Sequence, residues 1–235
     1  LAAAGVGRAG VLTNSVTHEK KIIFHPKILP AVVIADPVLT VGMPKAITAG
    51  TGMDAFAHCL EAFCSPHYHP LSHGIALEGL RLVQENLPRA YGVPDDLAAR
   101  GEMMSAAMMG AVAFQKGLGA IHAISHPLGA LYGLHHGTTN AVVMAPVLRF
   151  NRPAIEPQIE RAAAYLSITG GFDGFYALVE QLNDRLGIPQ SLAAMGVTDP
   201  DIEALLAGAL KDPSCGGNPI KLEPSNTRAL IESLF

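Results

Sequence analysis

Histidine is concentrated in one short stretch of this chain, which has ten histidines among its 235 residues. Four of them lie within residues 117–140: His122, His126, His135 and His136. The first two are four residues apart, and Asp54 and His58 show the same spacing in an apolar segment upstream. On a helix, side chains four residues apart point the same way. A carboxylate and several imidazoles held in this manner suit a divalent metal ion, so the pattern favours an enzyme over a scaffold.

Asp54 is the most informative member of the group because it stands between Met53 and the apolar run Ala55–Ala57. Burying an ionised carboxylate without a cation is costly. One oxygen and three nitrogen ligands suit Fe²⁺ or Zn²⁺ and leave coordination positions open for a substrate. A lone histidine on an apolar helix is more often an ordinary core residue. Two pairs at helical spacing, together with a further histidine, are harder to explain as core residues. Of the tandem His135 and His136, spacing alone does not select one.

The elements that must position these side chains are predicted to be mostly helical. Residues 1–43 contain two short β-branched runs bounded by prolines, Lys21–Phe24 and Ala31–Ala35, which are typical of strands. From Pro44 onward, alanine, leucine and methionine recur with helical periodicity. The predicted helices cover residues 45–64, 71–87, 95–115, 118–131, 137–150, 155–167, 172–186, 199–210 and 225–234. The sequence therefore predicts a mainly α domain over 44–235, preceded by a short β segment.

Composition limits the partners that the chain can be expected to bind. It is 49% hydrophobic and 15% charged, enough for a sizeable core. A net charge of −4 without a basic tract argues against nucleic acid or an anionic membrane as the main partner. No apolar run reaches the roughly 18 residues of a spanning helix, and the first residues lack signal-peptide features. Cys59, Cys64 and Cys215 form no disulfide framework and are expected to be reduced thiols of a cytoplasmic protein.

Three stretches form a recognisable set. Residues 50–63 read Gly-Thr-Gly-Met-Asp-Ala-Phe-Ala-His-Cys-Leu-Glu-Ala-Phe. Residues 117–132 read Gly-Leu-Gly-Ala-Ile-His-Ala-Ile-Ser-His-Pro-Leu-Gly-Ala-Leu-Tyr, and His-Gly-Thr-Thr-Asn follows at 136–140. Asp-Pro at 212–213 and Gly-Asn-Pro at 217–219 complete the set. Together they resemble the iron-containing (group III) alcohol dehydrogenases, a likeness that runs from about residue 12 to the end of the chain.

The resemblance assigns roles to individual residues. It implies four metal ligands: Asp54, His58, His122 and His136. His126 is then expected to lie beside the metal, near nicotinamide and substrate, and to relay the proton. Ile47 matches an apolar position that packs near the nicotinamide in this family. The implied cofactors are Fe²⁺, with Zn²⁺ as the alternative, and NAD or NADP.

The resemblance also implies a domain organisation. The family combines an N-terminal nucleotide-binding α/β domain with a helical, dehydroquinate synthase-like C-terminal half. Residues 44–235 would be the all-helical metal-binding catalytic domain, and residues 1–43 a remnant of the nucleotide-binding domain, without its Gly-Gly-Gly-Ser pyrophosphate loop. Residues 5–10 fit G-x-G-x-x-G, but no strand precedes them and no helix follows, so we expect no dinucleotide site there. Family members suggest a homodimer.

The implied reaction is reversible hydride transfer between a small primary alcohol or aldehyde and NAD(P). Two other classes stay open on the sequence. One is a metal-dependent hydrolase or lyase that uses the same ligands on activated water. The other is a metal-binding helical relic without dehydrogenase activity. Within the family, a zinc-dependent glycerol or sugar-alcohol dehydrogenase is an alternative, whereas the intact aspartate and histidine set disfavours a maleylacetate reductase.

Overall fold

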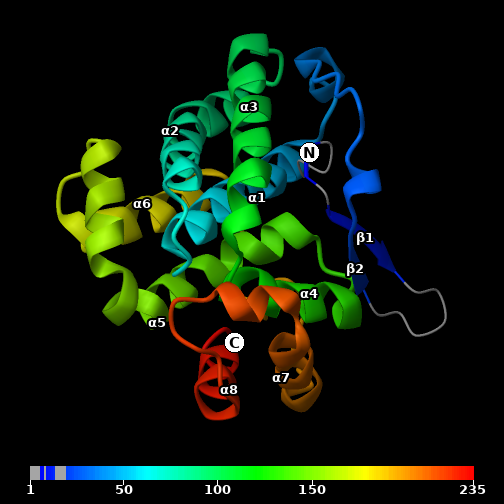
Figure 1. Ribbon diagram of the computed structural model, residues 1–235, viewed down its shortest axis with the longest axis vertical. Coiled ribbons are helices and arrows are strands. Elements are labelled where there is room, and N and C mark those ends of the chain that lie inside the picture. The colour runs from blue at the N-terminus through cyan, green and yellow to red at the C-terminus, as the bar shows by residue number, and fades with distance from the viewer. Residues whose placement is uncertain (1–5, 8, 14–19) are drawn as a thin grey trace.

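The computed structural model describes residues 6–7, 9–13 and 20–235, and eight α-helices dominate this part of the chain (Figure 1). They are α1 (Lys45–Cys64), α2 (Pro70–Gly92), α3 (Leu97–Ala113), α4 (Ala120–Tyr132), α5 (His136–Tyr165), α6 (Gly171–Arg185), α7 (Ile202–Lys211) and α8 (Pro224–Glu232). The predicted mainly helical fold is confirmed. No helix in the described ranges combines the length and apolarity that crossing a membrane requires.

A short hairpin and four 3-10 turns complete the described structure. Strand β1 (Ala9–Thr13) pairs antiparallel with β2 (Lys20–Phe24), so that Ala9 lies opposite Phe24. The 3-10 turns are η1 (Pro26–Ile28), η2 (Pro37–Thr40), η3 (Phe114–Lys116) and η4 (Pro213–Gly217). The strand predicted at Lys21–Phe24 is therefore present.

Helix α1 lies at the centre of the fold, where it packs against α2, α3 and α5 (Figure 1). Every residue from Met53 to Cys64 is buried, including the large side chains of Phe56 and Phe63. A helix buried on all sides is apolar on all sides. This explains why the segment around Asp54 lacks the polar face of a surface helix.

The C-terminal elements help to position α4. Helix α4 packs against both α5 and α7, and η4 also contacts α4. The Asn218 side chain, just after η4, accepts a hydrogen bond from the backbone N–H of Ala120 at 3.0 Å and pairs with Asn151 of α5. This loop thereby fixes the beginning of α4, the helix that contains His122 and His126.

Two sequence predictions about elements are wrong. The helices expected at 137–150 and 155–167 are one continuous helix, α5, which passes through Pro146, Pro153 and Pro157. Each proline removes one backbone donor, but its fixed φ is compatible with a helix. The packing of α5 against α1, α4 and α6 holds the segment together in spite of the missing hydrogen bonds.

The strand expected at Ala31–Ala35 does not form. The segment has no regular secondary structure, and Val32 and Ile34 are 76% and 86% exposed. β-Branched residues favour strands only where a neighbouring strand supplies hydrogen bonds and packing. No such partner for this segment exists among the described residues.

Candidate metal centre

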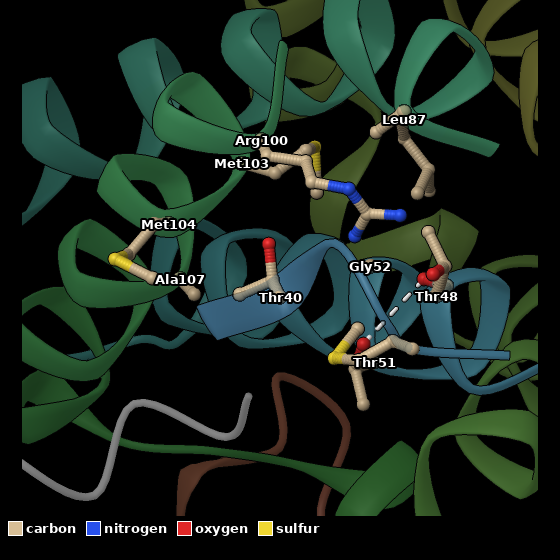
Figure 2. Close-up of a pocket in the computed structure, with 11 residues that line it drawn as sticks. Thr40, Thr48, Thr51, Gly52, Leu87, Arg100, Met103, Met104 and Ala107 are labelled. Carbon is tan, nitrogen blue, oxygen red and sulfur yellow. Dashed lines mark hydrogen bonds between the residues drawn. The ribbon is translucent and has the colours of Figure 1, made fainter. Parts of the chain in front are cut away.

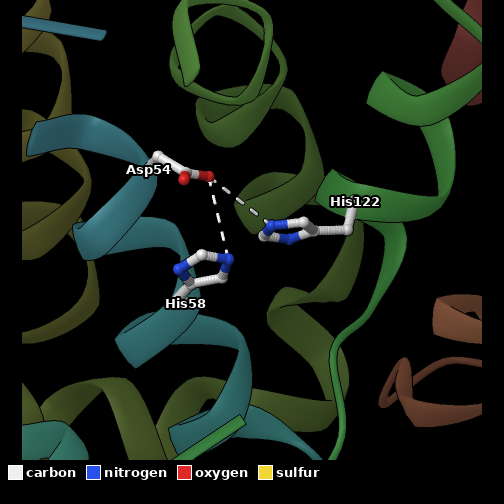
Figure 3. A group of neighbouring side chains, drawn as sticks. All are labelled: Asp54, His58 and His122. Carbon is white, nitrogen blue, oxygen red and sulfur yellow. Dashed lines mark ion pairs between the residues drawn. The ribbon is translucent and has the colours of Figure 1, made fainter. Parts of the chain in front are cut away.

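Three of the predicted ligands, all imidazoles, lie around a carboxylate oxygen of the fourth, Asp54. The Oδ1 atom of Asp54 lies 3.8 Å from His58 Nε2, 3.6 Å from His122 Nε2 and 3.5 Å from His136 Nε2. Figure 3 shows the first three of these side chains pointing toward one another. Bonds of about 2.0–2.2 Å to a central cation place tetrahedral ligands roughly 3.4 Å apart. The three separations from Asp54 Oδ1 match that spacing to within a few tenths of an ångström, and the ligand atoms of Asp54, His58 and His122 all lie within 4.8 Å of one another.

Three helices supply this cluster. Asp54 and His58 are one turn apart on α1, His122 is in the first turn of α4, and His136 is the first residue of α5. The side chains of Asp54, His58 and His122 are at most 9% exposed, whereas that of His136 is 29% exposed. The open side of the cluster is therefore at His136.

Burial and neighbouring charge set the protonation of the cluster. Burial alone raises the pKa of Asp54, but the neighbouring imidazoles of His58, His122 and His136 outweigh it and hold that pKa well below its usual range. Burial lowers the pKa of His58 to about 4 and that of His136 to about 3. Both imidazoles are then neutral at pH 7, the form that binds metal. Burial opposes a charge on His122 also, but Glu61 and Asp54 raise its pKa to about 9.

His126 lies beside this cluster and has a different partner. Its ring stacks on that of His136, with centroids 5.3 Å apart and an interplanar angle of 13°. Its Nδ1 atom lies 2.7 Å from the Oδ2 atom of Asp212, and the other oxygen of Asp212 accepts a hydrogen bond from the Ser214 N–H. Burial raises the pKa of Asp212, but the hydrogen bond with His126 brings it below its usual value. His126 and Asp212 form a carboxylate–imidazole pair next to the ligands.

Two polar side chains near the cluster were missed by the sequence analysis. Glu61 lies 2.6 Å from His122 Nδ1, and Asn140 donates its amide to Asp54 Oδ1 at 2.7 Å. Both stand at helical spacing from a candidate ligand: Glu61 is three residues after His58, and Asn140 is four after His136. That spacing is the sequence signal that could have found them.

The remaining predicted positions lie nearby. His135 is exposed and caps α5, where its ring nitrogen accepts from the Thr138 N–H, so the structure brings His136 rather than His135 to Asp54. Ile47 is half-buried on α1, seven residues before Asp54 and thus on the same face of the helix. Its packing against a nicotinamide stays a prediction.

A separate cavity of about 40 Å³ lies between the beginning of α1, α3 and the η2 turn (Figure 2). The guanidinium of Arg100 points into it, and Arg100 Nη2 and Thr48 Oγ1 lack hydrogen-bond partners in the described structure. A cavity needs a volume of about 10–15 Å³ to hold one water molecule. The space therefore suits a few water molecules.

The fold and the cluster define a helical domain with a buried aspartate and three converging imidazoles. Residues 48–235 match the model of the Fe-containing alcohol dehydrogenase family, C-terminal. The chain belongs to this family, as its sequence motifs indicated.

Individual relatives give the same result. The chain is 44% identical over 225 residues to a 4-hydroxybutyrate dehydrogenase of Cupriavidus necator, covering 91% of this chain and 58% of the relative. It is 36% identical over 217 residues to an NAD-dependent methanol dehydrogenase of Bacillus methanolicus, covering 89% and 57%. A solved structure of a 1,3-propanediol oxidoreductase superposes with a TM-score of 0.94 at 36% identity, covering 99% and 63%. The chain thus spans about three-fifths of the length of these relatives.

Proposed function

We propose that the protein containing this chain catalyses reversible hydride transfer between a small primary alcohol or aldehyde and NAD or NADP. The observation that carries the proposal is the convergence of three imidazole Nε2 atoms within 3.5–3.8 Å of Asp54 Oδ1. The names of the relatives, a 4-hydroxybutyrate and an NAD-dependent methanol dehydrogenase, support the reaction class and the acceptor.

The residues present fit a divalent cation, Fe²⁺ or alternatively Zn²⁺. Asp54, His58, His122 and His136 would hold it. When bound, such an ion supplies Lewis acidity, which lowers the pKa of a hydroxyl group and favours the alkoxide from which hydride departs.

His126 is the residue we propose for proton transfer. Because its Nδ1–H is donated to Asp212, its Nε2 retains a lone pair that can accept the proton of the alcohol hydroxyl. Asp212 holds the ring in that tautomer and stabilises the imidazolium that forms. His126 is 14% exposed, which leaves a route for the proton to solvent. Ile47 is proposed to pack near the nicotinamide.

Three expectations about the whole protein belong to the same proposal. We propose that residues 1–43 are part of a nucleotide-binding domain that precedes the helical domain at 44–235. Exposed apolar side chains at Val32, Ile34 and Leu39 support this, because the rest of such a domain would cover them. We further propose that the protein is a homodimer without nucleic-acid or membrane partners. We propose a cytoplasmic location because its three cysteines are free.

Metal analysis combined with an NAD(P)⁺-reduction assay tests the proposal. Purified protein, loaded with Fe²⁺ and then separately with Zn²⁺, is assayed with 4-hydroxybutyrate, 1,3-propanediol and methanol. We expect metal-dependent formation of NADH or NADPH that a chelator abolishes. Bound metal without turnover on any alcohol would instead support the metal-binding relic, and hydrolysis without nucleotide would support the hydrolase.

A further inference from the structure

Glu61 is a buried carboxylate whose two oxygens both have partners inside the protein. It is 6% exposed and lies on α1, on the same face as Asp54 and His58. Its Oε2 atom lies 2.6 Å from His122 Nδ1, and its Oε1 atom accepts a hydrogen bond from the Ile121 N–H at 2.7 Å. Across the described ranges, the ion pairs of Glu61 include His122 but no lysine or arginine.

The contact with Glu61 decides how His122 faces the cluster. A carboxylate accepts but does not donate, so the imidazole places a proton on Nδ1 to satisfy it. His122 Nε2, on the opposite side of the ring, lies 3.6 Å from Asp54 Oδ1, so the nitrogen that is deprotonated on metal binding is the one that faces the cluster. Metal-binding histidines commonly have their second ring nitrogen fixed by a carboxylate in this way.

Charge balance gives a second, independent reason to assign a role to Glu61. Asp54 and Glu61 are two buried carboxylates, and the partners of both within the cluster are imidazoles and an amide. When His122 gives up its second proton to bind a metal, these two carboxylates leave a charge of −2 in a buried volume. A single divalent cation would offset that charge, whereas burying it unpaired is costly.

We propose that Glu61 is a positioning residue of the metal centre. It fixes His122 in the tautomer that offers Nε2 and supplies the second of two buried negative charges that balance a divalent cation. This inference rests on the proposed function, since it assumes that Asp54, His58, His122 and His136 bind the metal. The competing role is purely structural: Glu61 would only cap the first turn of α4 through Ile121.

Zn²⁺ titration in competition with a chromogenic chelator separates these roles, because it measures metal affinity without activity. Glu61→Gln removes the charge but keeps a carbonyl oxygen for the Ile121 N–H. We expect its affinity for Zn²⁺ to fall by about 10- to 100-fold, with the unfolding temperature of the metal-free protein not reduced by more than a few degrees. The matched control is Asp212→Asn, which changes the carboxylate of a neighbouring imidazole that is not a proposed ligand, and it should bind Zn²⁺ nearly as well as the wild type.

A double-mutant cycle tests whether Glu61 acts through His122. In a His122→Ala background, Glu61→Gln should reduce Zn²⁺ affinity less than it does alone, because only the contribution of its charge is left. In the Zn²⁺-loaded wild type, we also expect a downfield imidazole N–H proton resonance from His122 that Glu61→Gln removes. This second readout is informative even where the variant protein is less stable.

The outcomes distinguish this inference from the function on which it rests. A wild type that does not bind Zn²⁺ overturns the metal centre and Glu61 with it. A wild type that binds Zn²⁺, with equal affinity in Glu61→Gln, leaves the metal centre standing and overturns the role of Glu61. Equal losses from Glu61→Gln in the presence and absence of His122 would also overturn it.

Discussion

Gly137 of α5 rests directly on the backbone of Gly50 in α1. A Cβ atom at position 137 would overlap the carbonyl oxygen of Gly50, and one at position 50 would lie 2.7 Å from the His135 ring. The two helices therefore meet backbone to backbone, one turn before Asp54 and one residue after His136. This contact sets the 3.5 Å separation between His136 Nε2 and Asp54 Oδ1.

Gly137→Ala should push α5 away from α1 and weaken metal binding. Overpacking of a close contact costs about 1–3 kcal/mol of stability, and the displaced His136 would no longer reach the cluster. Urea unfolding and Zn²⁺ titration measure the two effects. Gly74→Ala is the control, because a Cβ atom added to this helical glycine would meet nothing within 4 Å. It should leave metal binding intact and slightly raise stability, since alanine favours helix more than glycine.

Asp54→Ala and His126→Ala should have different effects on metal content. Asp54→Ala removes the carboxylate around which the imidazoles converge and should lose the metal. His126→Ala removes only the proposed proton acceptor, so the protein should retain its metal and lose about 10²-fold or more in kcat. Metal analysis and steady-state kinetics on both variants check this. If the two variants retain the metal equally, the assignment of ligands is wrong.

Asp212→Asn should lower kcat through His126. An amide at this position can donate to Nδ1, so the ring no longer has to present a lone pair at Nε2. We expect kcat to fall by about 10²- to 10⁴-fold, with metal content unchanged. The pH profile of kcat provides the discriminating readout: a shift of its acid limb is expected from a role in proton transfer. An unaltered profile with a proportionate loss of folded protein would indicate a structural role instead.

The buried cysteines predict a loss of stability at alkaline pH. Burial raises the pKa of Cys59 and of Cys64 to about 12, whereas an unfolded chain ionises its thiols near pH 8.5. Between these values the folded state binds more protons than the unfolded state, so the free energy of unfolding falls as pH rises. The loss is about 2 kcal/mol per thiol by pH 10, at about 1.36 kcal/mol per pH unit.

Urea unfolding at pH 8 and pH 10 measures this dependence. Burial lowers the pKa of Lys116 to about 8. Above that pH, Lys116 binds fewer protons in the folded state than in the unfolded state, so its effect on the free energy of unfolding opposes that of the thiols. The comparison that isolates the thiols is therefore between the wild type and the double variant Cys59→Ala, Cys64→Ala. The double variant should lose less stability between the two pH values. Equal losses of stability in both proteins would contradict the conclusion that the thiols are buried and protonated in the folded state.

The sequence pattern correctly predicts features that depend on a single helix. Helix α1 has the predicted bounds, 45 to 64, because its apolar composition and the preceding Pro44 are local features. Asp54 and His58 face the same way for the same reason. Proline is the misleading signal: Pro153 suggests a break near the middle of α5, but tertiary packing keeps the helix continuous.

The sequence by itself determined the ligand types and their helical pairing, because four-residue spacing is a property of a single helix. Only the tertiary structure decided which side chains meet. The contact of Gly137 with Gly50 brings α5 to α1, and the pairs Glu61–His122 and His126–Asp212 join residues 61 and 86 positions apart. No local pattern encodes such contacts, since they depend on how close the packed helices come and on the small residues that permit it.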